Sequence, residues 1–460
     1  MSRSRARSVV DVVAGPSPRT RAAERACRWA LAIALGVGAL TSVVSSPVAG
    51  SVTSGPSTSR SVTFDSTIYV ANLASHDVTP INAATGVAER PIKLGALSPV
   101  ALAVAPGSKT LYVVAVGSDE VGSPGSVIPI ATATDRPGKP IAVGASPQAI
   151  AITPNGEMAY VLNGIDAATT PSTTSATVTP IDLATGTARR PIKVGTLPLS
   201  MTMSPNGKLL YVVDSRQNNP GEPSAITPVN TATDTSAPAI SLARDLVPFS
   251  VSGLAFTSNS ATAYAITSSG IVAITTATRR LATAIGLRTS VPVAIAVTRN
   301  NSAIAEVGVP VTALEQGSPY ANNVTLAVLS TRTGVAGKVV TLGDEPGATS
   351  WEVVITSNGS TAYVLATTSS PRHSFVFRVD LTTGTAAKTI DVGRNASQIA
   401  VSANGATVFV LDSGTYVGPG SPRNVPGRVI PIATSAGTVG KAITVGLAPV
   451  GFAMTPTGKK

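Results

Sequence analysis

Few side chains in this 460-residue sequence have the types and spacing that catalysis requires. The two histidines are His76 and His373, and neither stands at a spacing from a serine or cysteine that indicates a catalytic triad. The single cysteine, Cys27, excludes an internal disulfide framework. The sequence contains no glycine-rich phosphate loop, no paired-carboxylate motif and no cluster of residues typical of a metal site. It therefore predicts neither a metal nor a cofactor, and it favours a non-enzymatic function.

Two polar residues stand out against the repeated segments of the chain. Segments like PQAIAITPNGEMAYVLN, which begins at Pro147, recur, and their third residue is small in most copies. In two successive copies this position holds Glu352, which follows Trp351, and then Gln398. Because a carboxylate that is buried alone costs free energy, such a residue must be hydrogen-bonded, paired or hydrated. Trp351, Glu352 and Gln398 are a candidate ligand site. A water-filled channel mouth, or sequence drift at the blade edge, is the alternative for them and also for Glu306, another acidic exception in the repeat.

A second group of candidates lies in the loops that follow the strand containing the repeated tyrosine. The long ones cover residues 116–125, 164–176, 215–224, 307–323 and 413–427. Insertions that concentrate in one type of loop mark a binding face in repeat proteins. The candidate binding residues there are Arg216 and Arg423, with Arg372 and His373 in a shorter counterpart. The alternative is that these are solvated loops without a ligand, because long surface insertions cost little stability.

The repeat that positions these residues has the pattern of short β-strands. In AIAIT, from Ala149, small residues alternate with branched ones, which is the period of a strand. Pro-Asn-Gly at 154–156 predicts a hairpin turn with a positive φ. The next strand has an aromatic residue at its centre in every copy but one, where Ala305 stands: Tyr69, Tyr112, Tyr160, Tyr211, Tyr264, Tyr363 and Phe409. We therefore expect the tyrosines to pack within the scaffold.

The spacing of these aromatic positions, about 49 residues, is typical of one propeller blade of four short strands. The two ends of the repeat array complement each other. PVGFAMTPTGKK, from Pro449, is a first strand and turn without a second strand, and STIYVAN, from Ser66, is a second strand without a first. The sequence predicts an all-β propeller of about eight four-stranded blades, closed by pairing of the C-terminal strand with Thr67–Ala71. Residues 65–460 would form this single domain.

The motif Tyr69-Val70-Ala71-Asn72 and its variants at 112–115, 160–163, 211–214 and 409–412 resemble the YVTN-repeat, or YncE-like, β-propellers of exported and surface-layer proteins. The turn at 154–156 and the ending Ile-Asp-x-x-Thr-Gly at 181–186 match that family's unit as well. The resemblance covers the chain from about residue 65 and implies the fold, whereas the repeat residues are scaffold and imply no ligand. Members of the family often have seven blades, so seven is the alternative count. Related propellers include sugar lactonases, which is the enzymatic alternative.

The net charge of +11 is unevenly distributed along the chain. Residues 1–50 carry a net charge of +5, and the remaining net +6 is spread without a run of basic residues or interleaved aromatics. Nucleic-acid binding needs clustered cations and stacking platforms, so we expect no nucleic-acid partner.

The N-terminal charges precede an uncharged, mostly apolar stretch at residues 29–44, followed by small residues up to Gly50. This order is typical of a secretory signal, and an uncleaved membrane anchor at 29–44 is the alternative. Residues 51–64 are rich in Ser and Thr and predict a linker. The sequence thus predicts a secreted or cell-surface propeller that binds an envelope or extracellular partner, either a protein or a glycan. The alternative function is an extracytoplasmic lactonase-like hydrolase at the channel mouth.

Overall fold

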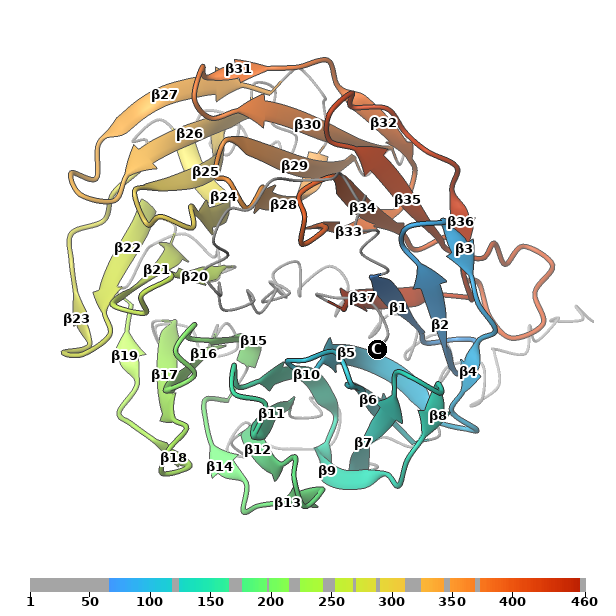
Figure 1. The fold of residues 1–460 in the computed structure, drawn as a ribbon. Coiled ribbons are helices and arrows are strands. Elements are labelled where there is room, and N and C mark those ends of the chain that lie inside the picture. Colours follow the sequence, from blue (N-terminus) through green and yellow to red (C-terminus); the bar gives the residue numbers. More distant parts are fainter. Residues whose placement is uncertain are drawn as a thin grey trace, which may run out of the picture.

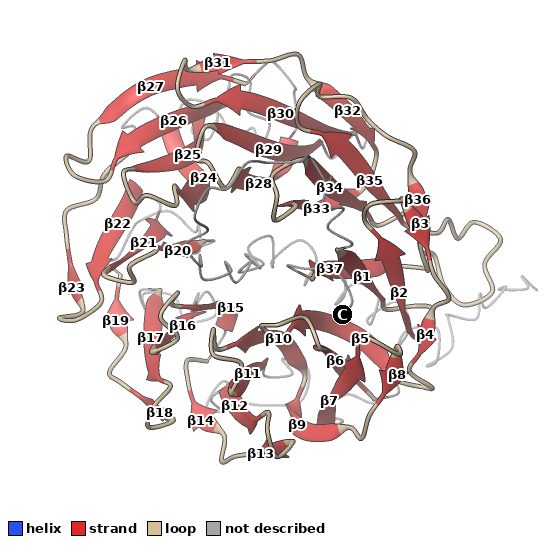
Figure 2. Ribbon diagram, in the orientation of Figure 1, coloured by secondary structure: helices blue, strands red, loops and turns tan. Residues whose placement is uncertain are grey.

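The computed structural model is an all-β propeller of eight blades arranged in a closed ring (Figure 1). It describes residues 66–117, 124–164, 176–196, 198–214, 224–242, 253–267, 270–286, 290–310, 324–342, 348–368 and 373–455. Every regular element in these ranges is a strand (Figure 2), and they contain no helix long and apolar enough to cross a membrane. The predicted fold class and the count of eight blades are confirmed. The predicted signal or anchor and the linker lie outside the described residues, so the domain boundaries remain predictions.

Each blade is an antiparallel sheet whose first strand lies nearest the centre of the ring (Figure 1). We number the blades 1 to 8 in chain order, with blade 1 built from both ends of the repeat array. The innermost strands of blades 1 to 8 are β37 (Pro449–Met454), β5 (Ser98–Val104), β10 (Pro147–Ile152), β15 (Pro198–Met203), β20 (Leu254–Phe256), β24 (Ser290–Val297), β28 (Ala348–Ile355) and β33 (Ala396–Val401). The second strands are β1 (Thr67–Asn72), β6 (Thr110–Val116), β11 (Met158–Asn163), β16 (Leu209–Asp214), β21 (Thr262–Thr267), β25 (Ala303–Pro310), β29 (Thr361–Thr368) and β34 (Thr407–Asp412).

The third strands carry the outer half of each sheet. They are β2 (Asp77–Asn82), β7 (Pro124–Ala131), β12 (Thr177–Asp182), β17 (Ala225–Asn230), β22 (Gly270–Thr275), β26 (Thr325–Ser330), β30 (Ser374–Asp380) and β35 (Arg428–Ala433). The fourth strand is short, and in blades 1, 2, 3, 4 and 7 it is split in two. Its pieces are β3 (Val87–Ala88), β4 (Ile92–Lys93), β8 (Arg136–Pro137), β9 (Ile141–Ala145), β13 (Thr187–Ala188), β14 (Ile192–Lys193), β18 (Thr235–Ser236), β19 (Ile240–Ser241), β23 (Arg280–Leu281), β27 (Ala336–Thr341), β31 (Thr385–Ala386), β32 (Ile390–Gly393) and β36 (Ile443–Thr444).

The hydrophobic core lies between neighbouring blades. Tyr160 and Leu162 of blade 3, for example, share one buried cluster with Met201 and Leu210 of blade 4. Period-two alternation sends successive side chains of a strand to opposite faces of its sheet, so each blade packs against both neighbours. The ring is therefore stabilised by eight interfaces of one kind, and the predicted alternation of small and branched residues serves them.

Blade 1 closes the ring as the sequence predicts. Strand β37 pairs antiparallel with β1, with Ile68 opposite Met454 and Asn72 opposite Pro449. Beyond the strand end, the Thr67 amide donates to the Thr455 hydroxyl at 2.8 Å, and the Thr455 amide donates to the Thr67 carbonyl at 2.9 Å. Residues almost 400 positions apart in the chain thus complete one sheet, which removes the open edges that an unclosed ring would expose.

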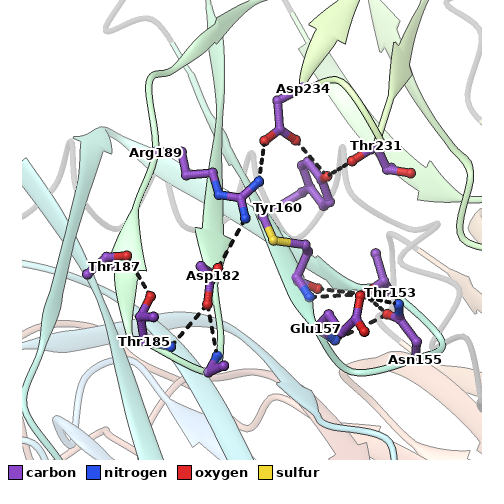
Figure 3. A network of polar contacts seen from close by, with 12 residues as sticks. Thr153, Asn155, Glu157, Tyr160, Asp182, Thr185, Thr187, Arg189, Thr231 and Asp234 are labelled. Atoms are coloured by element: carbon purple, nitrogen blue, oxygen red, sulfur yellow. Dashed lines mark hydrogen bonds and ion pairs between the residues drawn. The ribbon is translucent and has the colours of Figure 1, made fainter.

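Polar contacts at the outer turns fasten blade 3 to blade 4 (Figure 3). The Tyr160 hydroxyl donates its proton in a bifurcated hydrogen bond to Asp234 Oδ1, at 2.8 Å, and the Thr231 carbonyl, at 3.0 Å, both in the turn between β17 and β18. Arg189 joins Asp182 of its own blade, at 3.1 Å, to Asp234, at 2.9 Å. Burial, with Asp234 as the next cause, raises the pKa of Tyr160. Asp234 has a φ of 51°, in a turn where Gly186 stands one blade earlier with a φ of 66°.

Equivalent hydrogen bonds join other pairs of neighbouring blades. Tyr69 donates to Asp135 of blade 2 at 3.2 Å, and Tyr363 donates to the Thr434 carbonyl of blade 8 at 3.3 Å. The repeat tyrosines are therefore buried scaffold residues, and the hydroxyls of Tyr69, Tyr160 and Tyr363 reach the next blade. This confirms the structural role predicted for them.

Tyr160→Phe is expected to lower the free energy of unfolding by about 1.5 kcal/mol, because the Asp234 carboxylate and the Thr231 carbonyl lose their hydroxyl donor. Tyr211→Phe is the matched control, since the buried Tyr211 hydroxyl has no hydrogen-bond partner within the described residues. Its removal should leave stability unchanged or slightly raised. Urea denaturation of both variants measures the difference, and equal losses would contradict the assigned role of the Tyr160 hydroxyl.

Candidate functional site

The two predicted polar residues of the inner strands lie on adjacent blades. Glu352 is on β28 of blade 7 and Gln398 is on β33 of blade 8. Glu352 Oε2 accepts a hydrogen bond from the Ile399 amide at 2.9 Å, and Gln398 Oε1 accepts one from the Phe452 amide at 2.9 Å. Each side chain therefore reaches from its own innermost strand to the innermost strand of the next blade.

These two bonds have a common physical reason. An innermost strand pairs with a neighbour on one side only, so its other edge carries backbone groups without a ladder partner. Glu352 and Gln398 satisfy one such amide each. The series ends at the equivalent Gly451, where an added Cβ would lie 3.6 Å from Gln398 Oε1. The hydrogen bonds give Glu352 and Gln398 a structural role between blades, and the ligand site stays a prediction.

The surroundings of Glu352 on its inner strand shift the pKa of its carboxyl group. Burial raises its pKa to about 8, against a smaller lowering effect of the Ile399 amide. At neutral pH the carboxyl group is therefore mostly protonated, and it can exchange a proton. Trp351 lies in β28 next to Glu352, but its side chain is outside the described residues.

Glu306, the other acidic exception, is fully buried on β25 of blade 6. In the strand register it stands opposite Ile295 and Ala327. Gly286 approaches it so closely that an added Cβ would lie 3.0 Å from Glu306 Oε2. The residue is therefore enclosed between blades 5 and 6, away from solvent.

The predicted loop residues are only partly within the described chain. Arg216 and Arg372 lie outside it, as do the loops at 165–175, 215–223 and 311–323. His373 packs against Phe375 with ring centroids 5.1 Å apart, and its Nδ1 lies 3.6 Å from Asp391 Oδ1. Among the described residues no hydrogen bond joins His373 to Glu352. The structure thus brings Glu352 and Gln398 to neighbouring strands, and it leaves His373 and Arg423 in separate surroundings.

The loop at 413–427, which contains Arg423, has a defined internal structure. Thr415 and Val425 exchange two backbone hydrogen bonds, at 2.9 and 2.8 Å. The Asn424 side chain accepts from the Val417 amide at 2.9 Å and donates to the Gly418 carbonyl at 2.8 Å. Val417 and Val425 are nevertheless 56% and 52% exposed, and Arg423 is exposed as well. The loop is therefore ordered, while two of its apolar side chains are open to solvent.

Sequence reasoning missed the polar residues at the ends of the second strands. Asn72 donates to Asp77 at 2.8 Å and accepts from the Gly446 amide at 3.1 Å. Asp214 accepts from the Thr196 amide at 2.5 Å. Asp412 is paired with Arg428 at 2.5 Å and accepts from the Gly414 amide at 2.9 Å. The residue at the fourth position of these YVAN-like motifs was the signal for them in the sequence. The side chains of Asn72, Asp214 and Asp412 each accept a hydrogen bond from a backbone amide of an adjoining loop.

The described residues contain no group of three or more His, Cys, Asp or Glu side chains that could hold a metal ion. The acidic side chains near the loop face are engaged with neighbouring amides and cations, as the contacts of Asp77, Asp214 and Asp412 show.

Comparison with known proteins supports the fold and leaves the ligand open. No family model matches the chain, and no curated protein matches it by sequence. Among solved structures, it is similar to dihydro-heme d1 dehydrogenase NirN in complex with DHE, with a TM-score of 0.59 at 11% identity over 89% of this chain and 79% of that one. It is also similar to a putative 6-phosphogluconolactonase from Bacteroides uniformis, with a TM-score of 0.51 at 15% identity over 85% of this chain and all of that one. At these identities the likeness is one of β-propeller fold alone.

Proposed function

We propose that this chain is an exported propeller of the YVTN-repeat kind, which binds a cell-envelope protein or glycan through its loop face and performs no catalysis. The observation that carries this proposal is a contrast between two sets of side chains. Glu352 and Gln398 at the inner strands bond to neighbouring backbone amides. The loop at 413–427 instead holds Val417 and Val425 open to solvent on an ordered frame.

Two properties of the loop favour binding of a partner. Its internal hydrogen bonds restrict its conformation before any partner arrives, so association costs less conformational entropy. Exposed valines gain free energy when a partner covers them, about 1.5–3 kcal/mol for each side chain that becomes fully buried. Arg423, two residues before Val425, adds a cation with a planar hydrogen-bonding group.

Val417→Ser with Val425→Ser is expected to weaken binding to an envelope fraction at least tenfold, because two apolar contacts are removed. Co-sedimentation of the purified protein with cell-wall and membrane fractions measures this binding. The control is Leu281→Ser, which alters an apolar side chain that is 41% exposed on blade 5. Equal losses in both variants, or no sedimentation with any fraction, would refute the loop as the binding surface.

Export is supported by the arginine-rich start and the apolar stretch at 29–44. N-terminal sequencing of protein recovered from the culture medium should begin near residue 50. Recovery of the intact N-terminus in the membrane fraction would instead show an anchor, with the propeller held at the surface.

A lactonase-like hydrolase is the second candidate, and the pKa of about 8 at Glu352 is the observation that favours it. A carboxyl group that is protonated near neutrality can act as a general acid. Hydrolysis of a panel of sugar lactones by the purified chain, abolished in Glu352→Gln, would establish this function. Rates equal to those in buffer would exclude it for the lactones tested.

A further inference from the structure

The outer segments of the eight blades share a pattern that the fold does not explain. After the turn that follows each third strand, a segment of seven residues contains all or part of the fourth strand. These rim segments are 87–93, 136–142, 187–193, 235–241, 280–286, 335–341, 385–391 and 438–444. Their sixth residue is Ile or Val in every blade, and their fourth residue is a cation in six: Arg90, Lys139, Arg190, Lys338, Lys388 and Lys441.

The fourth and sixth residues of the rim segments differ in burial, and only the sixth packs into the scaffold. The sixth residue packs inward, as Ile92, Ile192 and Ile443 show with 5 to 6% exposure. The fourth-position cations are all exposed. Blades 4 and 5 form their outer strands with Pro238 and Thr283 at this position. A blade therefore folds without the cation, and its repetition in the other blades needs another cause.

The net positive charge of the chain after residue 50 is concentrated in the rim segments. Together they contain eleven basic side chains, all exposed, and two acidic ones, Glu89 and Asp391. Their net charge of +9 exceeds the net +6 of the whole chain after residue 50. The other residues after position 50 together carry a net charge of −3. A surface of one sign concentrated on one part of a protein attracts ligands of the opposite sign.

Ring closure makes the six cation-bearing blades contiguous, in the order 6, 7, 8, 1, 2 and 3. Their outer strands β27, β31, β36, β3, β8 and β13 succeed one another around the rim (Figure 1). Residues about 49 positions apart in the sequence thereby form one row on the circumference. The row is densest in blades 1 to 3, whose rim segments hold seven cations.

We propose that this rim binds a linear acidic polysaccharide through its row of cations. The rim segments contain no Phe, Tyr or Trp, so they lack the platforms on which nucleobases stack. The rim is convex, which suits a flexible chain that can follow the curve better than a stiff duplex. Exposed prolines accompany the cations in the densest part, at Pro91, Pro140 and Pro191, and present apolar surface to the C–H faces of sugar rings.

Some rim cations already have a role within the ring. Lys93 is paired with Asp77, Arg189 with Asp182 and Asp234, and Lys338 donates to the Thr382 carbonyl of blade 7. Arg90, Lys139 and Arg190 are the fourth-position cations of blades 1 to 3. They are exposed, which makes them the best residues for a test that leaves the fold intact.

The test compares Arg90→Gln/Lys139→Gln/Arg190→Gln with Lys109→Gln/Lys208→Gln/Arg299→Gln, both in the full chain. The second set removes the same charge from exposed residues in the hairpin turns between innermost and second strands. Binding to polygalacturonate, neutral dextran and a single-stranded oligonucleotide is measured by titration at several salt concentrations, and thermal unfolding checks the fold.

We expect the rim variant to bind polygalacturonate at least tenfold more weakly, with a shallower dependence on salt, because fewer counterions are released. The hairpin-turn variant should stay within twofold of the wild type, and dextran should not bind. An equal loss in the two variants would show attraction to net charge alone, and tighter binding of the oligonucleotide would indicate a nucleic-acid partner. Either result, or no binding of polygalacturonate, overturns the proposal. The rim is separate from the loop at 413–427, so the Val417→Ser/Val425→Ser variant should retain this binding.

Discussion

A chain that ends at residue 447 is expected to lose cooperative folding of the ring, because it lacks β37. Phe452 packs among Val70 and Leu411 at the interface between blades 1 and 8. Loss of one large buried side chain costs about 3–5 kcal/mol. The pairing with β1, the Thr67 and Thr455 bonds and the amide bound by Gln398 disappear with it. The total approaches the roughly 5–15 kcal/mol by which a native protein is stable.

Thermal unfolding followed by circular dichroism measures this loss. The control is a chain that ends at Thr455, which retains β37 and should melt with the full-length protein. A synthetic peptide of residues 448–460, added to the truncated chain, should restore part of the transition by pairing with β1. A truncated chain that melts within a few degrees of the control would show that closure contributes little.

The second large effect concerns pH and Glu352. Its pKa is about 8 in the folded protein, whereas an unperturbed glutamate has a pKa of about 4.3. The folded state therefore holds this proton more tightly than the unfolded state does. The contribution of this group to the free energy of unfolding is highest at low pH, and it falls as the pH rises from about 4.3 to about 8.

Glu352→Gln is expected to leave the free energy of unfolding at pH 4 nearly unchanged and to raise it at pH 8 by ~2 kcal/mol. This value is smaller than the full pKa shift implies, because the side chain is partly exposed and solvent screens its charge. The Gln amide oxygen can still accept the Ile399 hydrogen bond. Urea denaturation between pH 4 and pH 9 tests this, with the exposed Glu157→Gln as the control for loss of one carboxylate. If wild type and Glu352→Gln show parallel pH profiles, Glu352 does not change its proton affinity on folding.

The repeat made the architecture of this protein predictable. Each copy contains the alternation of its innermost strand, the turn glycine and the central aromatic residue, so eight weak signals support one another. Gly156 and Gly207 have the positive φ values, 74° and 71°, that the Pro-Asn-Gly turns require. The incomplete copies at the two ends predicted the pairing of β37 with β1.

The site was less predictable because its contacts cross between blades. Glu352 and Gln398 were recognisable as exceptions to the repeat, but an alignment of copies does not show that each side chain reaches an amide of the next blade. The exposure of Val417 and Val425 depends on how their loop folds on itself. The rim cations form no cluster along the chain, because the ring brings together residues that lie one blade apart in the sequence.

Closure of blade 1 must also wait until the C-terminal strand has been synthesised. Thr67 and Thr455 are 388 residues apart, and at about 5–20 residues per second the ribosome needs roughly 20–80 s to make that length. Throughout this interval β1 lacks its inner partner, and its free edge is open to pairing with other strands. A factor that covers this edge during synthesis would therefore raise the yield of closed rings, whereas incomplete chains would stay open and exposed to proteases.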